Sequence, residues 1–467
     1  MNPFRRKRIS FSVGVAMFII SMHACAELPK AQGYQGIWYS NEATHDEYVY
    51  KYSGGLGTYC ADHIPIAVYA PAVRKTFFVY GGVNPESVSL LEMVSFYDHA
   101  TGTVPRPTIL LDKKTADAHD NPVISLDAQG YVWVFASSHG TARPSYIFKS
   151  KAPYNVDDFA LVVKTNFSYP QPWYVPEHGF FFLHTRYENG RALYWMTSVD
   201  GAAWSQGKLL SHIEEGHYQV SWPYGAKLGT AFNYHPKGQG LNFRTNLYYV
   251  ETNVRDGDKA AWLNARGESV ETPVTAVANA ALVHDYQAEG LKVYIQDVNY
   301  DVKGRPIILY LTSKGWQPGP QNGPHTWRVA HWTDTAWAFH DVTTSDNNYD
   351  TGCLHAEPDG AWRIIGPTET GPQPFNPGGE IAMWTSQDRG NTWTKVRQLT
   401  RGSAYNHTFV RRPLNAHPEF YAVWADGHAR QRSESRLYFC NQTGDRVWRL
   451  PFQIDAEFAA PELLESK

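Results

Sequence analysis

A cysteine and a histidine separated by one residue are the first candidates for chemistry in this chain. Cys353 and His355 alternate along an expected strand, which places both side chains on one face. Thiolate and imidazole are common zinc ligands, so His284, His331 or His340 could complete a structural site. The Cys-x-His spacing is nonspecific by itself. A structural zinc or calcium ion is therefore expected at most, and no cofactor is expected for the chemistry itself.

Two acidic residues near expected strand ends offer a different chemistry. Glu380 follows two glycines at 378–379, and Asp426 follows Trp424 and Ala425. A pair of carboxylates is what most glycosidases use to cleave a sugar linkage. Carboxylates at strand ends also accept hydrogen bonds from turn amides, and this structural role is the interpretation that we favour.

The elements that must position these residues are mainly strands. β-branched and aromatic runs occur at 66–69, 76–80, 131–135, 180–183 and 306–310. Turns rich in Asp and Gly separate them, at 127–130, 301–304 and 359–360. No helical period persists beyond two or three turns. The pattern predicts an all-β protein.

One motif indicates how the strands are arranged. Residues 386–393 read Ser-x-Asp-x-Gly-x-Thr-Trp, the Asp-box of sialidase-like β-propellers, and a weaker copy lies at 198–204. Asp388 can accept hydrogen bonds from turn amides, and Gly390 supplies a positive φ. Trp393 then begins a strand and packs between neighbouring sheets. A lone copy would fit an ordinary hairpin turn, but two copies in a strand-rich chain predict a β-propeller. Seven four-stranded blades of roughly 60 residues each would account for residues 27–467 as one domain.

The first 26 residues have the pattern of a signal peptide. A basic stretch at 5–8 precedes an apolar stretch from about 9 to 22, and Ala24-Cys25-Ala26 forms an A-x-A cleavage site. Cleavage after Ala26 predicts a secreted or periplasmic protein. The rival interpretation is lipidation at Cys25, which His23 fits poorly. We expect no membrane span elsewhere, because no other stretch is long and apolar enough.

Charge and cysteine content narrow the classes of function. Without the four basic residues of the leader, 38 basic residues face 45 acidic ones, a net charge of −7. An acidic body argues against a nucleic-acid partner, which requires a basic face. A few arginines in a groove can still attract an anionic sugar. Three cysteines remain in the mature chain, and this odd number leaves at least one thiol unpaired. We expect a monomer.

Four segments resemble a known family. They lie at 33–38, 52–59, 76–82 and 244–249. They are similar to segments of the BNR-repeat seven-bladed propellers, a group that includes ulvan lyases and a related family of α-L-rhamnosidases acting on rhamnosyl-glucuronate. The resemblance extends over nearly the whole mature chain, and it implies an anionic polysaccharide as the substrate.

The same resemblance implies a set of site residues. The catalytic histidines of the lyases match His119 and His139, the tyrosine matches Tyr169 and the arginine matches Arg186. A substrate-binding arginine matches Arg244, and Tyr224 is a looser match to a further tyrosine of the catalytic canyon. Singly, each has an ordinary structural interpretation. For example, His119 follows a turn, and Arg186 could pair with Glu188 on the surface.

These residue types suit the β-elimination of a uronate. The reaction removes the C5 proton of the uronate, which is weakly acidic while the carboxylate is charged. A guanidinium paired with that carboxylate stabilises the developing enolate, a role for Arg186 with Arg244 in support. Tyr169 could move the proton if a nearby arginine lowers its pKa. His119 or His139 could serve as the base or neutralise the carboxylate.

The sequence leaves two other functions open. His63 matches the single catalytic histidine of the related rhamnosidases, which use the opposite face of the propeller. The alternative to a lyase is therefore a hydrolase that removes rhamnose, with His63 and Tyr169 at opposite ends of the molecule. His63 could instead be a buried structural residue. A non-catalytic carbohydrate-binding propeller is the third class. Our interpretation is a polysaccharide lyase of the ulvan lyase type.

Overall fold

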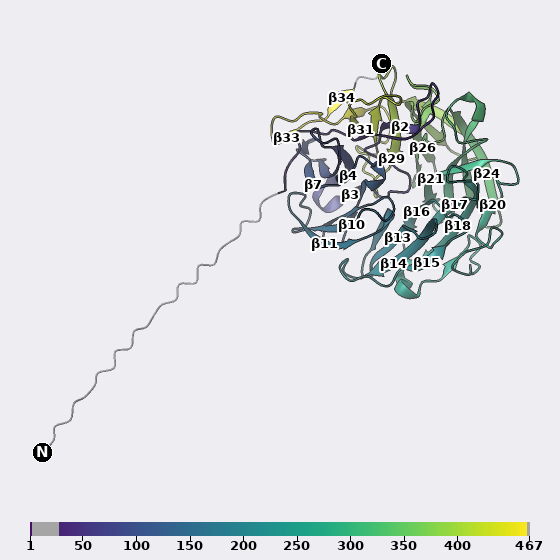
Figure 1. Cartoon of the computed structure of the whole chain (residues 1–467), viewed down its shortest axis with the longest axis horizontal. Helices are drawn as coiled ribbons and strands as arrows, with labels where there is room; N and C mark the ends of the chain where they lie inside the picture. The colour runs from purple at the N-terminus through teal and green to yellow at the C-terminus, as the bar shows by residue number, and fades with distance from the viewer. Residues whose placement is uncertain (2–27, 465–467) are drawn as a thin grey trace.

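The computed structural model describes Met1 and residues 28–464, and the described chain is nearly all β-strand. Seven sheets of four or five strands form a ring (Figure 1). This arrangement confirms the predicted seven-bladed β-propeller. Apart from Met1, the predicted signal peptide at 1–26 lies outside the described residues, so its cleavage stays a prediction.

Each blade is an antiparallel meander whose strands follow the order of the chain. The first three blades are β3 (Ala67–Ala70), β4 (Lys75–Val83), β5 (Leu90–Asp98) and β7 (Thr108–Asp112); β8 (Pro122–Leu126), β9 (Val132–Ala136), β10 (Ser145–Ser150) and β11 (Phe159–Thr165); and β12 (Ser168–Val175), β13 (Gly179–Tyr187), β14 (Arg191–Ser198) and β15 (Lys208–Ser211). The fourth consists of β16 (Gln219–Tyr224), β17 (Lys227–Tyr234), β18 (Thr245–Asn253) and β19 (Trp262–Leu263), with β20 (Leu282–His284) also paired to β18.

The remaining blades follow the same plan. They are β21 (Lys292–Tyr300), β22 (Pro306–Ser313), β23 (His325–Trp332) and β24 (Trp337–Ser345); β25 (Cys353–Ala356), β26 (Trp362–Glu369), β27 (Glu380–Ser386) and β28 (Thr394–Gln398); and β29 (Asn406–Arg411), β30 (Ala422–Gly427), β31 (Leu437–Cys440), β32 (Val447–Arg449) and β34 (Glu462–Leu464). Outside the blades lie β1 (Trp38–Ala43), β2 (Tyr50–Gly55), β6 (Val104–Pro105), β33 (Phe458–Ala459) and the short 3₁₀ helices η1 (Pro71–Val73), η2 (Ala118–Asp120), η3 (Val254–Lys259) and η4 (Pro320–Asn322).

Burial falls from the inner to the outer strands of a blade. Strand β9, with the sequence VWVFA, is buried throughout, whereas the outer strand β28, with the sequence TKVRQ, is mostly exposed. Inner strands pack against neighbouring blades on both faces, so they are continuously apolar instead of alternating. Large aromatic side chains fill the wedges between blades. Trp133 of β9 lies 5.2 Å, centroid to centroid, from Phe180 of the next blade.

Both Asp-boxes adopt one geometry. In the full copy, the Ser386 hydroxyl accepts from the Gly390 amide at 2.7 Å, Asp388 accepts from the Thr392 amide at 2.9 Å, and Trp393 Nε1 donates to the Gly390 carbonyl at 3.0 Å. In the weaker copy, Ser198 accepts from Gly201 at 2.8 Å and Trp204 donates back to Gly201 at 3.0 Å. Each box is the turn between the third and fourth strands of its blade. The motif therefore marks a blade corner.

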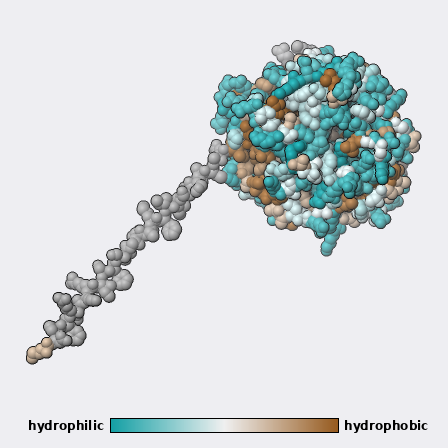
Figure 2. Space-filling view, viewed as in Figure 1, coloured by the Kyte–Doolittle hydropathy of each residue, from teal (hydrophilic) through white to brown (hydrophobic). Residues whose placement is uncertain are grey.

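The last blade closes the ring against the first. In Figure 1 the purple strands β3 and β4 stand beside the yellow strands of the C-terminal blade. Leu414 forms a parallel bridge with Val68, and β33 pairs with β6. Backbone hydrogen bonds thus cross the seam between the two ends of the chain. On the face seen in Figure 2, hydrophilic side chains predominate, with small hydrophobic patches between them.

A hairpin formed by β1 and β2 lies outside the blades and packs on the last one. Thr408 Oγ1 donates to the Gly55 carbonyl at the end of β2. A Cβ on Gly55 would stand 1.7 Å from the Asp426 carbonyl oxygen, so only glycine permits this approach. The hairpin and the loop after it, residues 56–64, lead to the cavity described below.

Two further expectations can be compared with the fold. Cys60, Cys353 and Cys440 are all free and buried, which confirms that the fold does not depend on disulfides. Within residues 28–464, no helix is long and apolar enough to cross a bilayer.

The geometry of the Asp-box predicts that adding a methyl group at Gly390 destabilises the protein. Gly390 has a φ of +87°, and an added Cβ would lie 2.5 Å from the Trp362 ring. Gly390→Ala should lower the free energy of unfolding by about 1–3 kcal/mol more than Gly360→Ala does. Gly360 is the matched control, because its φ is +90° but no atom lies within 4 Å. Chemical denaturation measures both, and equal losses would contradict the packing role of the box.

Candidate active site

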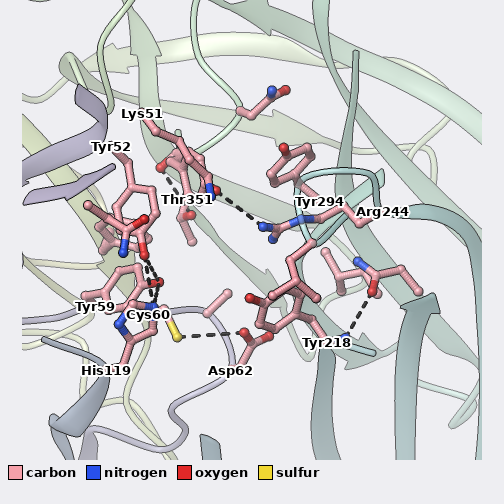
Figure 3. Close-up of a pocket in the computed structure, with 18 of the residues that line it drawn as sticks. Lys51, Tyr52, Tyr59, Cys60, Asp62, His119, Tyr218, Arg244, Tyr294 and Thr351 are labelled. Atoms are coloured by element: carbon pink, nitrogen blue, oxygen red, sulfur yellow. Dashed lines mark hydrogen bonds between the residues drawn. The ribbon is translucent and has the colours of Figure 1, made fainter. Parts of the chain in front are cut away.

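The structure contains a cavity of about 270 Å³, and Figure 3 shows many of the side chains that line it. Its walls come from the β1–β2 hairpin, the loop 59–62, η2 and inner-strand ends of several blades. Figure 3 shows His119 with Tyr52 and Tyr59 on one side, and Arg244 with Tyr218 and Tyr294 on the other. Residues from distant parts of the chain therefore meet in one pocket.

Two histidines share one carboxylate at the edge of the cavity. The rings of His119 and His139 stack with centroids 3.9 Å apart and planes inclined by 16°. Asp117 lies 2.5 Å from His119 Nδ1 through one oxygen and 2.8 Å from His139 Nδ1 through the other. An ionised carboxylate only accepts hydrogen bonds, so both Nδ1 atoms carry protons. In the neutral form of either ring, the lone pair is therefore on Nε2.

Local structure holds the carboxylate in place. Asp117 caps η2 by accepting from the His119 amide at 3.1 Å, so the turn fixes His119 relative to it. Arg143 Nη2 contacts Asp117 at 3.2 Å and Asp120 at 2.8 Å, and Asp120 accepts from the His139 amide at 2.9 Å. This partly buried network orients both imidazoles before any substrate arrives.

Two tyrosine hydroxyls form hydrogen bonds with the other ring nitrogen of His119. The hydroxyls of Tyr52 and Tyr59 each lie 2.9 Å from Nε2. Because Nε2 bears the lone pair, the tyrosines are the donors. Burial lowers the pKa of His119 to about 4, although Asp117 opposes the shift. Burial also raises the pKa of both phenols well above 10. At neutral pH the group is therefore a neutral imidazole facing two protonated phenols.

Three cations line the same cavity. Arg191, Arg244 and Lys51 are each at least nine-tenths buried. The Arg244 guanidinium lies 4.4 Å from the rings of both Tyr218 and Tyr294, and Arg191 stacks on Tyr218 at 4.8 Å. Arg191 Nη1 and Arg244 Nε are buried donors without a hydrogen-bond partner among the described residues. Unpaired buried donors are costly, so the pair is suited to an anionic acceptor.

Two carboxylates lie among these cations. Lys51 pairs with Glu42 at 3.1 Å, and burial followed by the charge of Arg244 lowers the pKa of Lys51. Burial raises the pKa of Asp62 to about 7, against the opposing charges of Arg244 and Arg411. Asp62 is thus partly neutral near pH 7, and the cavity keeps an excess of positive charge.

The structure separates the residues expected to form the site. His119, His139 and Arg244 line the cavity. Tyr169 lies behind the wall: it is 1% exposed, and its hydroxyl is 3.3 Å from that of Tyr187, which does line the cavity. Burial raises the pKa of Tyr169 well above 10, with Arg191 opposing the shift.

Arg186 and Tyr224 lie outside the cavity lining. Side chains alternate along β13, so Arg186 and Tyr187 point to opposite faces. Arg186 stacks on Tyr194 at 4.5 Å and approaches Glu188 at 4.0 Å. Tyr224 ends β16, six residues beyond Tyr218, which places it about 20 Å along the strand at 3.3 Å per residue.

His63 is not on the opposite face. Its ring centroid lies 5.6 Å from that of Tyr169, so the expectation that these two residues occupy opposite ends of the propeller is wrong. The loop 59–64 crosses the ring, and Arg411 holds it by donating to the carbonyls of Ala61 and His63 at 3.0 and 2.9 Å. His63 is fully buried, and neither of its ring nitrogens has a hydrogen-bond partner in the described chain.

The remaining candidates have ordinary partners. Cys353 Sγ lies 3.7 Å from His355 Nε2, but His331 bonds to Asp301 at 3.1 Å and His284 to Glu289 at 2.5 Å. Among the described residues, the pair belongs to no group of three metal-ligating side chains. Glu380 accepts from Thr400 and Ser403, and Asp426 accepts from Tyr438, which fits the turn-holding role.

Comparison with known proteins places the chain in a family. A model described as "BNR repeat-containing family member" matches residues 97–345, more than half of the chain. The chain belongs to the BNR repeat-containing family. This BNR-repeat protein is 22% identical to an ulvan lyase of Nonlabens ulvanivorans over 356 residues, which cover 67% of this chain and 72% of the relative.

Solved structures agree with the fold. An ulvan lyase from a new polysaccharide lyase family matches with a TM-score of 0.70 and 15% identity, covering 89% of this chain and 96% of the other. An ulvan lyase structure bound to GlcA(1-4)Rha3S matches over the same shares, with 15% identity and a TM-score of 0.69. At this identity the likeness supports the propeller fold of this BNR-repeat protein and not its reaction.

Sequence reasoning missed several residues of the cavity. They are Lys51, Tyr52, Tyr59, Asp62, Tyr187, Arg191, Tyr218, Tyr294 and Tyr349, together with Asp117, which bonds to His119 without lining the cavity. A signal existed for Asp117, which precedes His119 by two residues in an Asp-x-His-Asp sequence. Arg191 had no such signal, because only the strand register shows that it faces the cavity and Arg186 does not.

The raised pKa of Asp62 predicts how stability depends on pH. The unfolded chain releases this proton near its ordinary value of 3.8, and the folded chain near 7. The folded state therefore binds more protons in this window, so this residue makes stability fall as pH rises through it.

The Asp62→Asn variant lacks the titrating carboxyl group, so this cause of the fall in stability with rising pH is absent. Relative to the wild type, its free energy of unfolding should rise by up to about 4 kcal/mol from pH 4 to 7 and then level off. Denaturant titrations at several pH values measure the difference. Asp256→Asn, at an exposed position on η3, is the control and should show no such rise. A pH-independent difference for Asp62→Asn would contradict the assignment.

Proposed function

We propose that this BNR-repeat protein is a polysaccharide lyase that cleaves an anionic, uronate-containing polysaccharide of the ulvan type, at a rhamnose–uronate linkage, by β-elimination. Similarity to ulvan lyases supports this class. One observation carries the proposal: two buried arginines with unpaired N–H donors line the same cavity as two histidines that share a single carboxylate.

Arg191 and Arg244 are the groups proposed to bind the uronate carboxylate. Elimination turns this carboxylate into part of an enolate, so negative charge grows where the arginines can stabilise it. Their guanidinium groups are fixed by tyrosine rings on both sides, and little reorganisation is needed when charge develops. Lys51 adds a third positive charge at the same wall.

Proton removal is proposed to use the Tyr52–Tyr59–His119 group. A protonated phenol cannot take the C5 proton, but either hydroxyl can pass its own proton to the neutral Nε2 of His119 as its oxygen takes the one from C5. The resulting imidazolium is stabilised by Asp117, as in other carboxylate–histidine pairs. The C5 proton is thereby transferred, in effect, to His119.

Protonation of the leaving oxygen is assigned to His139. Its Nδ1 is held by Asp117, whereas its Nε2 has no protein partner among the described residues, and its side chain is 27% exposed. When protonated, His139 can donate the Nε2 proton to the leaving O4 as the C4–O4 bond breaks and the C4–C5 double bond forms. His119 gains a proton and His139 loses one, so the charge around Asp117 is conserved.

The test uses the purified mature protein with ulvan. A lyase produces an unsaturated uronate, seen as a rise in ultraviolet absorbance, without free rhamnose. Release of rhamnose from ulvan or gum arabic without unsaturated product would replace the proposal with a hydrolase. Saturable binding with neither product would replace it with a carbohydrate-binding propeller.

The neighbouring arginines provide a matched pair of variants. Arg191→Gln should lower kcat by about 10²-fold or more, because it removes a preorganised charged donor. Arg186→Gln should leave kcat within about twofold, because Arg186 stacks on Tyr194 outside the cavity. Initial rates on ulvan measure both, with melting temperature as the fold check. The reverse ranking would move the carboxylate site to Arg186.

Asp117 should control proton transfer. Asp117→Asn cannot stabilise an imidazolium or accept equally from two Nδ1–H groups, so kcat should fall by about 10²-fold or more. The melting temperature and KM report whether folding and substrate binding survive. Asp256→Asn serves again as the control carboxylate. A variant that is folded and nearly fully active would remove the shared carboxylate from the mechanism.

A further inference from the structure

A second cluster of metal-ligating side chains lies outside the cavity, at the seam where the ring closes. His99 follows β5 in the first blade, and His417 and Glu419 precede β30 in the last. Candidate ligand atoms of the three residues all lie within 4.8 Å of one another. No residue of this cluster lines the proposed active site.

The ring of His99 is oriented so that one nitrogen can bind a metal ion. Its Nε2 is 2.8 Å from the Thr76 hydroxyl, which can accept a hydrogen bond from an Nε2–H group and so leave the lone pair on Nδ1. Nδ1 is buried and has no hydrogen-bond partner in the described chain, and Glu419 Oε2 stands 3.5 Å away. Ligands of a tetrahedral zinc ion at about 2.0–2.1 Å lie about 3.4 Å apart, so this spacing suits one ion between them.

His417 completes the set from the loop before β30. Its ring centroid is 3.9 Å from that of His99, and its Nδ1 accepts from the Glu419 amide at 3.1 Å. Ligation through Nδ1 would replace that single backbone contact.

The active-site pair of His119 and His139 is less available to a metal ion than the cluster at the seam. Both oxygens of Asp117 and both nitrogens of His119 already have hydrogen-bond partners, and Arg143 adds a positive charge. A cation would have to displace these contacts. At the seam, the buried Nδ1 of His99 is free for a ligand.

We propose that His99, His417 and Glu419 bind one zinc ion that joins the first blade to the last. Two imidazoles and a carboxylate suit zinc better than calcium or magnesium, which prefer oxygen ligands. The Glu419 side chain is 45% exposed, so water can complete the coordination. An ion here would supplement the backbone bridge of Val68 with Leu414.

The experiment uses the full mature chain after removal of metals with a chelator, and zinc as the probe. Zinc should bind with one equivalent per chain at this site, and the melting temperature should rise with zinc concentration, because the ion binds only the folded seam. Magnesium at the same concentration should produce no rise. Isothermal titration and thermal melts measure the two effects.

Three variants locate the ion. Glu419→Gln, at a half-exposed position, should fold normally and weaken zinc binding by at least about tenfold. Cys353→Ser and Asp117→Asn test the other candidate locations and should bind zinc as the wild type does. Unchanged affinity in Glu419→Gln would overturn the proposal, as would absence of binding to the wild type. Loss of binding in Cys353→Ser or Asp117→Asn alone would move the ion to that location.

Discussion

The chemistry of the cavity depends on one carboxylate, that of Asp117. Each of its oxygens holds the Nδ1 proton of one histidine, and this fixes the tautomer of both rings. The lone pair of His119 then meets the Tyr52 and Tyr59 hydroxyls, and that of His139 stays available to a ligand. Burial would by itself raise the pKa of Asp117, but electrostatic interaction with the two histidine rings and the hydrogen bonds that they donate hold it well below its ordinary value. The carboxylate therefore stays ionised while protons move around it.

The propeller can hold several buried charged residues in one cavity because it brings strand ends from many blades to one place. Arg191 starts β14, Arg244 precedes β18 and His139 follows β9. Isolated buried charges destabilise a protein, but here aromatic rings stack on both guanidinium groups, and aromatic faces attract cations. The unpaired N–H donors of Arg191 and Arg244 destabilise the folded protein. An anionic ligand would accept hydrogen bonds from them and remove this destabilisation.

Ring closure is the second constraint on the molecule. The first and last blades are the only neighbours in the described chain without a short connection, so their contact depends on side chains and on bridges such as Val68 with Leu414. The cluster of His99, His417 and Glu419 lies at this seam. The β1–β2 hairpin, which supplies Tyr52 to the cavity, also packs on the last blade.

The sequence by itself determined the class of fold and part of the site. Strand-length apolar runs and two Asp-boxes indicated a β-propeller, because turn chemistry and strand patterning are local properties. The number of blades came from the chain length and from the resemblance to a family. The resemblance to a family located His119, His139 and Arg244, which the structure brings together. Only the tertiary structure decided that Arg191 faces the cavity and Arg186 does not, that Tyr169 lies behind Tyr187, and that His63 packs against Tyr169. These facts depend on strand register and on a loop that crosses the ring. Both are set by packing between blades, and a one-residue change in register reverses the face to which a side chain points.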